Sequence, residues 1–518
     1  MEAPLPSTSA TTAAGSLHVV AMPYPGRGHI NPIMSFCKIL SSRVPDIIIT
    51  FVVTEEWLGF IGSDTKPTNI SLAAIPNVLP SELVRAQHYS EFADAVFTKM
   101  GDPCEELLDR LLPAPAIIVA DTLLKWAISA GSRRNIPVAS FWPMSAWGFS
   151  FFSHFHLLER NGHFPVDLTE KGDERVNYIP GLPPTRLADL LHSGRNNPFL
   201  QGFLDAFKIV REAKYLLLAT VYEVDYLAVD VVKASLSFPV YTIGPAIPLS
   251  RLADDSCLND ADYLKWLDCQ PSNSVLYISL GSFLSVSSSK MDEIAGCLCN
   301  SGVRFLWVGR DEAARLRELC GDRGIIVPWC DQSRVLSHSS VGGFWTHCGW
   351  NSILEAVFAG VPMLAYPIAM DQGRNALMVI EDWKIGWRVD TDITGLVHKF
   401  MDLEDDESRE IRRQAKHLQE VCRQAIGKDG STETNINSFI RDISHCNDSS
   451  LRFNVFLHPG KRATHQPHDA LLQRSCFPEP PTSPSPCSSQ RARLVFFATV
   501  PNLLLPDRVQ ARRFSEFI

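Results

Sequence analysis

Two polar side chains near the beginning of the chain have the types needed for proton transfer. His29 lies in the segment Gly26–Pro32 (GRGHINP), after the apolar run Leu17–Met22, and Asp121 ends the apolar run Ala116–Asp121. Such runs predict buried strands of a parallel sheet, which places His29 in a loop at the same sheet edge as Asp121. An imidazole whose Nδ1–H is held by a carboxylate can accept a proton through Nε2. We therefore predict a His–Asp general base; the alternative is that each residue caps the following helix.

A second group of polar and aromatic residues lies within 44 residues, Trp329–Gln372. The runs Gly324–Trp329, Val341–His347 and Val361–Tyr366 predict strands, and Asn351–Ala359 has the apolar spacing of a helix. Strand–helix–strand order at this spacing predicts a parallel sheet with a right-handed crossover. Ligands bind such sheets beyond the carboxyl ends of the strands.

The side chains around the predicted helix start suit a nucleotide diphosphate. The first N–H groups after His347 lack helical partners and can bind an anion. Asn351 and Ser352 can add donors to a phosphate. Glu355 lies one turn after Ser352 on the same face and can accept hydrogen bonds from ribose hydroxyls. The alternative is an ordinary capped helix with a solvated Glu355.

Three further positions complete this ligand site. Trp329 offers a flat face for a base, and Asp371 and Gln372 offer acceptors and a donor for sugar hydroxyls. An earlier apolar run, Val275–Leu280, ends in Gly281-Ser282, where a glycine allows close approach of a ligand and Ser282 can donate to a phosphate. The alternatives are a Trp at the rim of the core and a simple turn at the strand end.

These segments resemble the motifs of the plant UDP-dependent glycosyltransferases of secondary metabolism. Gly26–Pro32 is similar to the PGxGHxNP motif of that family, and Ala120–Ala127 to its ADxxxxWA motif. Trp329–Gln372 resembles its signature box in length and in the residues Trp329, Gln332, His347, Gly349, Trp350, Asn351, Ser352, Glu355, Pro362, Asp371 and Gln372. The stretches PYPGRGHINP, WCDQ and GGFWTHCGWNS are most similar to family 87 of these enzymes. The resemblance covers about residues 15–444.

The resemblance implies a GT-B fold, an α/β architecture in which two Rossmann-like parallel-sheet domains face each other across a cleft. It implies that a UDP-sugar is bound, that His29 and Asp121 are catalytic, and that transfer inverts the anomeric centre without a metal ion or other cofactor. The closing Gln372 goes with glucose more often than galactose. The implied UDP-sugar contacts are Gly28, Ser282, Trp329, Cys330, Gln332, His347, Gly349, Trp350, Asn351, Ser352, Glu355, Asp371 and Gln372.

Within this set the resemblance gives each residue a part of the donor. Trp329 would stack on uracil, Gln332 would lie near the uridine and Glu355 would hold the ribose. Two groups would share the rest: His347, Asn351 and Ser352 at the diphosphate, and Trp350, Asp371 and Gln372 at the sugar. The sequence departs from the family pattern at Asp331, where proline is usual, and at Trp345, where a smaller apolar residue is common. Both departures bear on fine donor geometry.

The acceptor is expected in the N-terminal half of the chain. Two segments are candidate walls, the aromatic-rich Phe141–Phe155 and Val84–Phe97. Aromatic side chains suit a flat apolar acceptor such as a phenolic compound or a hormone, although plain core packing is the alternative for each. The candidates in the first segment are Phe141, Trp142, Trp147, Phe149, Phe151 and Phe152.

The chain of 518 residues is long enough for two domains. The predicted divisions are a disordered N-terminus (1–15), an acceptor-binding domain (16–245), a UDP-sugar-binding domain (246–444) whose last helices can pack back on the first domain, and an atypical, disordered tail (445–518). The Gly/Pro-rich Tyr241–Ser250 is the expected linker. The tail is low in complexity and carries nine prolines; a regulatory or membrane-surface role is its alternative.

Composition excludes several classes of protein. A net charge of −9 gives no basic surface for nucleic acid. Thirteen cysteines without paired metal spacing, no signal peptide and no apolar window of membrane length predict a reduced, cytoplasmic monomer without a membrane span. Two alternatives to a glycosyltransferase remain. One is a non-catalytic UDP-sugar or metabolite-binding protein. The other is a nucleotide-dependent oxidoreductase, but the sequence lacks the third glycine of the dinucleotide-binding motif after Gly26 and Gly28.

Overall fold

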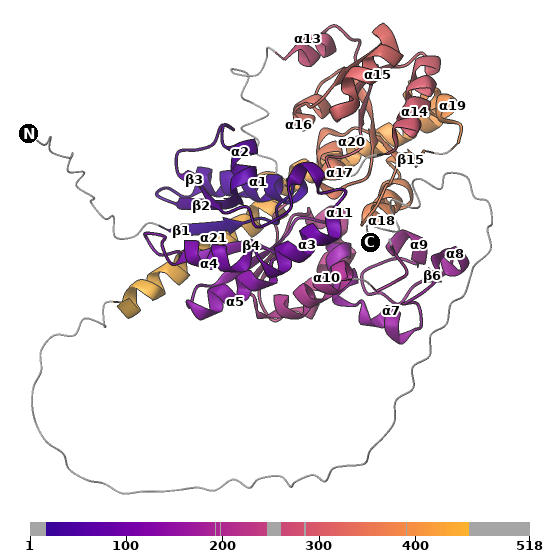
Figure 1. The fold of residues 1–518 in the computed structure, drawn as a ribbon. Coiled ribbons are helices and arrows are strands. Elements are labelled where there is room, and N and C mark those ends of the chain that lie inside the picture. Colours follow the sequence, from indigo (N-terminus) through magenta and orange to yellow (C-terminus); the bar gives the residue numbers. More distant parts are fainter. Residues whose placement is uncertain are drawn as a thin grey trace, which may run out of the picture.

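Two parallel β-sheets, each covered by helices, form the body of the molecule (Figure 1). The computed structural model describes residues 17–454 except 192, 197, 246–260, 284, 285 and 390, and describes the backbone alone at 198, 322 and 446–454. The predicted disordered ends, 1–15 and 445–518, lie outside this part except for residues 445–454, which continue the last helix. The two sheets confirm the predicted α/β architecture of two Rossmann-like domains.

The first sheet has seven strands in the order β3-β2-β1-β4-β5-β8-β9, all parallel. Its central strands are apolar on both faces, as expected of a parallel sheet covered by helices on each side. The strands are β1 (His18–Met22), β2 (Ile48–Thr54), β3 (Ile70–Ile75), β4 (Ile117–Asp121), β5 (Val138–Trp142), β8 (Tyr215–Leu218) and β9 (Val240–Thr242).

Helices and short turns connect these strands. They are α1 (Arg27–Arg43), α2 (Glu55–Ile61), η1 (Glu82–Val84), α3 (Tyr89–Thr98), α4 (Gly101–Leu108), α5 (Lys125–Arg133), α6 (Ala146–Ser153), α7 (His156–Arg160), α8 (Leu168–Lys171), α9 (Leu187–Leu190), α10 (Pro198–Ile209), η2 (Val210–Glu212) and α11 (Tyr222–Ser235). A small antiparallel pair, β6 (Arg175–Val176) and β7 (Thr185–Arg186), lies in the long connection before α9.

The second sheet has six parallel strands in the order β12-β11-β10-β13-β14-β15. The strands are β10 (Val275–Ser279), β11 (Arg304–Val308), β12 (Gly324–Val327), β13 (Val341–Thr346), β14 (Met363–Ala365) and β15 (Gly386–Arg388). The connecting helices are α13 (Asp262–Asp268), α14 (Ser288–Ser301), η3 (Arg310–Glu312), α15 (Ala313–Cys320), η4 (Gly321–Arg323), α16 (Gln332–Leu336), α17 (Trp350–Ala359), α18 (Gln372–Leu377), η5 (Met378–Asp382) and α19 (Ile393–Met401).

The last two helices return to the first domain. Helix α20 (Asp406–Ile426) packs on α17 and α11, and α21 (Ser431–Asn454) crosses the edge of the first sheet at β9 (Figure 1). Phe439 packs edge-on against Tyr215 and Tyr241, and the Tyr241 hydroxyl donates to Asp442 Oδ2 over 2.5 Å. The C-terminal helix therefore ties both domains together.

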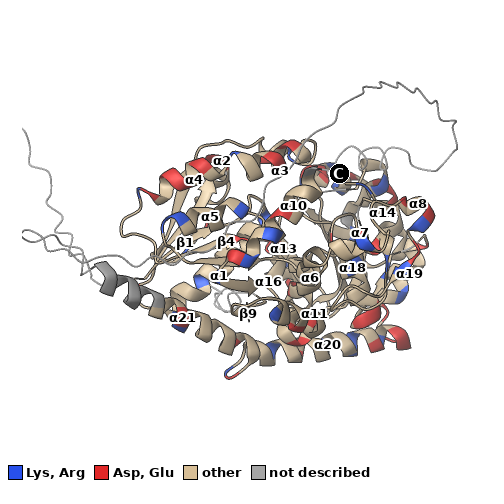
Figure 2. Cartoon of the chain, turned by 90° about the horizontal axis from the view of Figure 1, so that it is seen from below, with Lys and Arg blue, Asp and Glu red and all other residues tan. Residues whose placement is uncertain are grey.

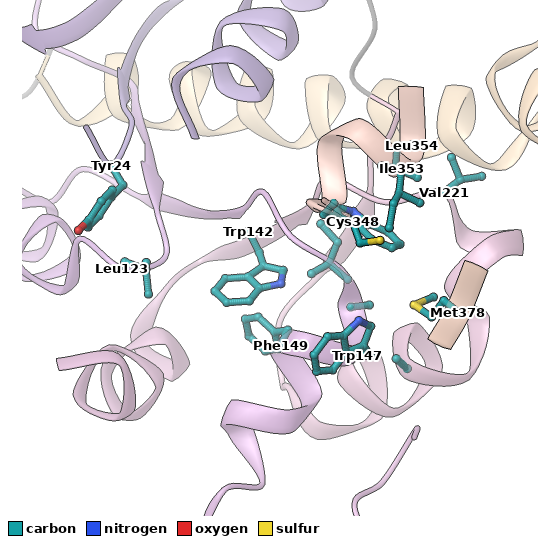
Figure 3. Packing of buried hydrophobic residues seen from close by; sticks show 14 of the residues in the cluster. Tyr24, Leu123, Trp142, Trp147, Phe149, Val221, Cys348, Ile353, Leu354 and Met378 are labelled. Atoms are coloured by element: carbon teal, nitrogen blue, oxygen red, sulfur yellow. The ribbon is translucent and has the colours of Figure 1, made fainter. Parts of the chain in front are cut away.

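Apolar packing continues from one domain into the other. One cluster of buried residues contains Trp147 of α6 together with Cys348, Ile353 and Met378 of the second domain, as Figure 3 shows. Because this interface is apolar and close-packed, the relative position of the two sheets is set by packing and not by a flexible linker.

Two sequence predictions about local structure are wrong. His29 was predicted in a loop, but it lies in the first turn of α1, which begins at Arg27. Pro32, the sixth residue of α1, has no N–H for the Gly28 carbonyl one turn earlier, and that carbonyl accepts from Asn351 Nδ2 instead. The predicted linker begins inside the sheet, because Tyr241 pairs with Leu217 at the sheet edge, while residues 246–250 lie outside the described part.

The surface carries both signs of charge. Acidic and basic side chains alternate along α20 and α21, as Figure 2 shows. Among the helices of residues 17–454, none combines the length and the apolar character that crossing a bilayer requires.

Candidate functional site

The predicted His–Asp pair is formed at the carboxyl edge of the first sheet. His29 Nδ1 donates a hydrogen bond of 2.7 Å to Asp121 Oδ2, and Asp121 Oδ1 accepts the Leu123 N–H over 3.0 Å. The Asp121 side chain is fully buried, whereas that of His29 is 20% exposed. The carboxylate therefore fixes the ring and the Nδ1–H tautomer, which leaves Nε2 as the free base. The bond to His29 excludes simple helix capping as the only role of Asp121.

The start of α17, where an anion site was predicted, has no side-chain cap. Gly349 occupies the N-cap position without a side-chain cap, so the first N–H groups of the helix are not satisfied from within it. His347 lies just before this start, between two glycines: a Cβ at Gly281 would lie 2.9 Å from its Cδ2, and one at Gly349 would overlap its Nε2. Burial lowers the pKa of His347 to about 4, so the ring is neutral at physiological pH.

The residues predicted for the nucleoside form one hydrogen-bonded network. Gln332 Nε2 donates to Ser352 Oγ over 2.9 Å and also to a Glu355 carboxylate oxygen. Ser333 Oγ donates to Glu355 Oε1 over 2.9 Å, and Tyr277 OH donates to Gln332 Oε1 over 3.1 Å. Burial raises the pKa of Glu355. This network orients α16 against α17 and positions the Glu355 carboxylate.

The aromatic ring predicted to stack on the nucleobase is open to solvent. Trp329, two residues after the end of β12, is 51% exposed although it is a large apolar side chain. The next residue, Cys330, is buried with its Sγ 3.4 Å from the Tyr277 hydroxyl, and burial raises the pKa of its thiol to about 12. Asp331 caps α16 by accepting the Arg334 N–H, so the departure from proline here supplies a helix cap.

Two of the three residues predicted for the sugar, Asp371 and Gln372, lie at the start of α18, whereas Trp350 is the first residue of α17. Gln372 Oε1 accepts the backbone N–H groups of Ile368 and Ala369 over 2.8 and 2.9 Å, which leaves the Gln372 NH₂ group as a donor. Asp371 Oδ2 accepts from Asn375 Nδ2 over 2.9 Å. Burial raises the pKa of Asp371.

Three hydrogen bonds join these elements to the first domain. Asn351 Nδ2 donates to the Gly28 carbonyl over 2.7 Å, one residue from His29. The Trp350 indole is buried and donates to the Ala219 carbonyl over 3.1 Å, so this side chain serves the domain interface. Trp147 Nε1 donates to Asn375 Oδ1 over 2.8 Å. The start of α17 is thereby held beside the start of α1.

The aromatic wall predicted at Phe141–Phe155 is mostly core. Of its six candidates only Phe152 is partly exposed; the others are packed in the core, and Figure 3 shows Trp142, Trp147 and Phe149 among the residues of one buried cluster. The prediction that they line an acceptor site is wrong for the buried Phe141, Trp142, Trp147, Phe149 and Phe151.

The second predicted wall, Val84–Phe97, lies near His29. The ring of Tyr24 lies 5.0 Å from that of His29, and Phe92 lies 6.2 Å beyond it. Tyr89 packs 4.9 Å from Phe283 of the second domain. Tyr24, Tyr89 and Phe92 are themselves buried, so they belong to the core beside His29, and the second predicted wall is packed in the same way as the first.

Several residues of the site were not found from the sequence. Arg27 lies with its guanidinium 4.6 Å from the centre of the Trp329 ring, and Arg85 lies 4.3 Å from that of Phe283. Both contacts join residues more than 190 positions apart, so no local spacing signals them. Asn375 was detectable, because it lies one helical turn after Asp371.

The remaining predicted residue, Ser282, is exposed in the loop after β10, next to Gly281 with its φ of +91°. Within the described ranges, no three His, Cys, Asp or Glu side chains gather as a metal site would require.

Comparisons with known proteins identify the family. Residues 249–393 match the family model of the UDP-glucuronosyl and UDP-glucosyl transferases, a range that contains every predicted donor residue except Gly28. UDP-glycosyltransferases 87A1 and 87A2 of Arabidopsis thaliana are each 49% identical to the chain; the alignments cover 82% and 83% of it and 99% and 97% of the relatives.

Solved structures support the fold. UGT2 of Phytolacca americana, in complex with UDP-2-fluoro-glucose and pterostilbene, superposes with a TM-score of 0.70 at 26% identity, covering 83% of this chain and all of that one. A UDP-glucose:anthocyanidin 3-O-glucosyltransferase in complex with UDP gives 0.73 at 24% identity, which bears on the fold alone, with 83% and 99% of the two chains covered. The chain belongs to the plant UDP-glycosyltransferases, enzymes of the GT-B fold.

Proposed function

We propose that the protein transfers glucose from UDP-glucose to a hydroxyl or carboxyl group of a small apolar acceptor, with inversion and with His29 as general base. The observation that carries the proposal is the 2.7 Å bond between His29 Nδ1 and Asp121 Oδ2, at an edge joined to α17 by the bond from Asn351 to Gly28. A base held beside an anion site is the arrangement that sugar transfer from a nucleotide requires.

In the proposed step His29 Nε2 takes the proton of the acceptor hydroxyl as its oxygen attacks the anomeric carbon. The bond from that carbon to the UDP oxygen breaks on the opposite face, and UDP leaves with the electron pair. Asp121 stabilises the imidazolium that forms. Negative charge on the leaving UDP is met by the start of α17 with Asn351, Ser352 and the neutral His347, and Ser282 is placed to add a donor.

The donor preference is proposed from Gln372. Its carbonyl oxygen is used by Ile368 and Ala369, so its NH₂ group points a donor toward a sugar hydroxyl. The proposed metal independence follows from the supply of N–H and hydroxyl donors at the diphosphate. The bound pterostilbene of the Phytolacca enzyme supports a flat phenolic acceptor for this chain.

The test is His29→Ala, with His398→Ala on the exposed face of α19 as the matched control. UDP release should be screened with several UDP-sugars against phenolic, terpenoid and hormone acceptors, and UDP binding should be measured by tryptophan fluorescence. We expect His29→Ala to lose transfer by 10²-fold or more, about the size of a general-base contribution, while UDP binding stays. Unchanged transfer would remove His29 from the mechanism.

The same assay decides between the alternatives. A wild-type protein that binds UDP but transfers no sugar to any acceptor is a non-catalytic binding protein. Binding of NAD in place of UDP would indicate an oxidoreductase. Loss of transfer in chelator with recovery on adding magnesium would contradict the proposed metal independence.

A further inference from the structure

Arg27 of the N-terminal domain places its guanidinium cation on the ring of Trp329, which is predicted to stack on uracil. It is the first residue of α1, two positions before His29, and its guanidinium lies 4.6 Å from the centre of the Trp329 ring and 5.7 Å from that of Trp57. Trp57 is buried in its own domain, whereas Trp329 belongs to the other domain and is half exposed. Arg27 thus bridges the two domains through aromatic faces.

This cation has no carboxylate partner. Among the described residues Arg27 forms no ion pair, and the first turn of α1 contains no acidic residue. Its charge is felt nearby, because it helps to lower the pKa of Glu82, which burial raises to about 7. A guanidinium at an aromatic face without a carboxylate is available to an anionic ligand.

The neighbouring donors are mostly neutral. His347 is uncharged at physiological pH, and Asn351 and Ser352 supply neutral hydrogen bonds. Arg310 brings a positive charge from the second domain, but its Nη1 donates to the Gly281 carbonyl over 3.2 Å. A nucleoside diphosphate brings more negative charge than a helix start with about half a unit charge can balance.

Position and reach favour the diphosphate as the partner of Arg27. The residue after it, Gly28, accepts the Asn351 hydrogen bond over 2.7 Å, so the Arg27 backbone lies beside the start of α17. A base that stacks on the face of Trp329 covered by the guanidinium displaces it. Once displaced, the planar guanidinium can bind phosphate oxygens in a bidentate manner.

We propose that Arg27 is a donor-binding residue, which rests on the Trp329 ring in the free enzyme and pairs with the diphosphate when the nucleotide binds. This rests on the donor site of the proposed function. Under this proposal, Arg27 in the domain of His29 neutralises part of the negative charge of the diphosphate. Binding of the donor is therefore coupled to the contact between the two domains.

The experiment compares UDP with uridine, which has the same base and ribose but no charge. Binding of each is measured by calorimetry on the full chain for wild type, Arg27→Gln and Arg27→Lys, with Arg211→Gln on the exposed face of η2 as control. We expect Arg27→Gln to raise the Kd of UDP about tenfold, as for loss of one charge-assisted hydrogen bond, and not to weaken uridine. Arg27→Lys should lie between the two, because it keeps the charge but not the planar fork.

Three results would overturn the inference. An unchanged Kd for UDP in Arg27→Gln removes the contact. Equal weakening of UDP and uridine binding would mean that Arg27 contacts the uracil or supports the fold. Tighter UDP binding in the variant would mean that Arg27 obstructs the nucleotide. Failure of the wild type to bind UDP is a different outcome, because it rejects the donor site itself.

Discussion

The side chain of Asn351 donates to the carbonyl oxygen of Gly28 over 2.7 Å, and this bond connects α17, the helix proposed to hold the diphosphate, to α1, which carries His29. In a regular helix the Gly28 carbonyl would accept from the N–H of residue 32, but that residue is Pro32, which has no N–H. The proline therefore leaves a carbonyl free for the second domain, beside His29.

This relationship predicts a coupling between Asn351 and Pro32. Asn351→Ala should lower the free energy of unfolding by about 1 kcal/mol, the net value of one hydrogen bond. In a Pro32→Ala background the restored N–H competes for the same carbonyl, so Asn351→Ala should cost less. A double-mutant cycle by denaturant unfolding measures this difference. Additive effects of the two substitutions would contradict the shared role of the Gly28 carbonyl.

The carboxylate of Asp121 sets the tautomer of His29, which predicts the effect of Asp121→Asn. The amide can still accept the Leu123 N–H, but its NH₂ group then faces His29 Nδ1 and favours the proton on Nε2. We expect kcat to fall about 10²- to 10⁴-fold with little change in UDP affinity. Steady-state kinetics and UDP calorimetry check this. A variant with full kcat would mean that the pair is structural.

Trp329 is expected to act on the nucleotide and not on the fold. Because it is 51% exposed, Trp329→Ala should leave the free energy of unfolding nearly unchanged. Loss of a stacked base is worth about 1–3 kcal/mol, so the Kd of UDP should rise by about 5- to 150-fold. Trp329→Phe should retain part of the affinity. Equal UDP affinity in the alanine variant would place the base elsewhere.

Two glycines of the same turn should differ in tolerance. A Cβ at Gly26 would overlap Arg85 Nη1, which is buried and donates to the Pro25 carbonyl over 2.9 Å. A Cβ at Gly28 meets only Asn351 Nδ2, at 3.9 Å. Gly26→Ala should therefore destabilise the protein by about 1–3 kcal/mol, and Gly28→Ala by less than about 1 kcal/mol. Thermal and denaturant unfolding of both variants distinguishes them; equal losses would contradict the close approach of Arg85.

Burial of His347 predicts a pH dependence of stability. Its pKa is lowered to about 4 in the folded protein from about 6.5 in the unfolded chain, so between these values the unfolded state binds more protons. Stability from this group is full above about pH 6.5 and is lost as the pH falls toward 4. His347→Gln should flatten the slope of unfolding free energy against pH in that window. Glu82 and Asp225 also titrate abnormally, but they contribute equally to both proteins. Identical slopes would contradict the burial of a neutral His347.

The sequence alone determined the class of fold and most of the donor site. Apolar runs with helical segments between them leave a parallel α/β sheet as the way to bury both faces of each strand, and ligand residues must then follow strand ends. His347, Asn351 and Glu355 are close in sequence on one strand–helix unit, so local spacing was enough to place them together. Asp121 was placed with His29 because both follow strands of one sheet.

Tertiary structure decided what depends on contacts between distant elements. The cation on Trp329 and the bond from Asn351 to Gly28 arise from packing one domain on the other, which no periodicity records. The aromatic residues of β5 and α6 have the composition of either a core or a binding wall, and the packing of α6 on α10 and α11 made all but Phe152 core. Local spacing fixes which side chains share an element, whereas their partners across the molecule are set by how the two sheets and their helices pack.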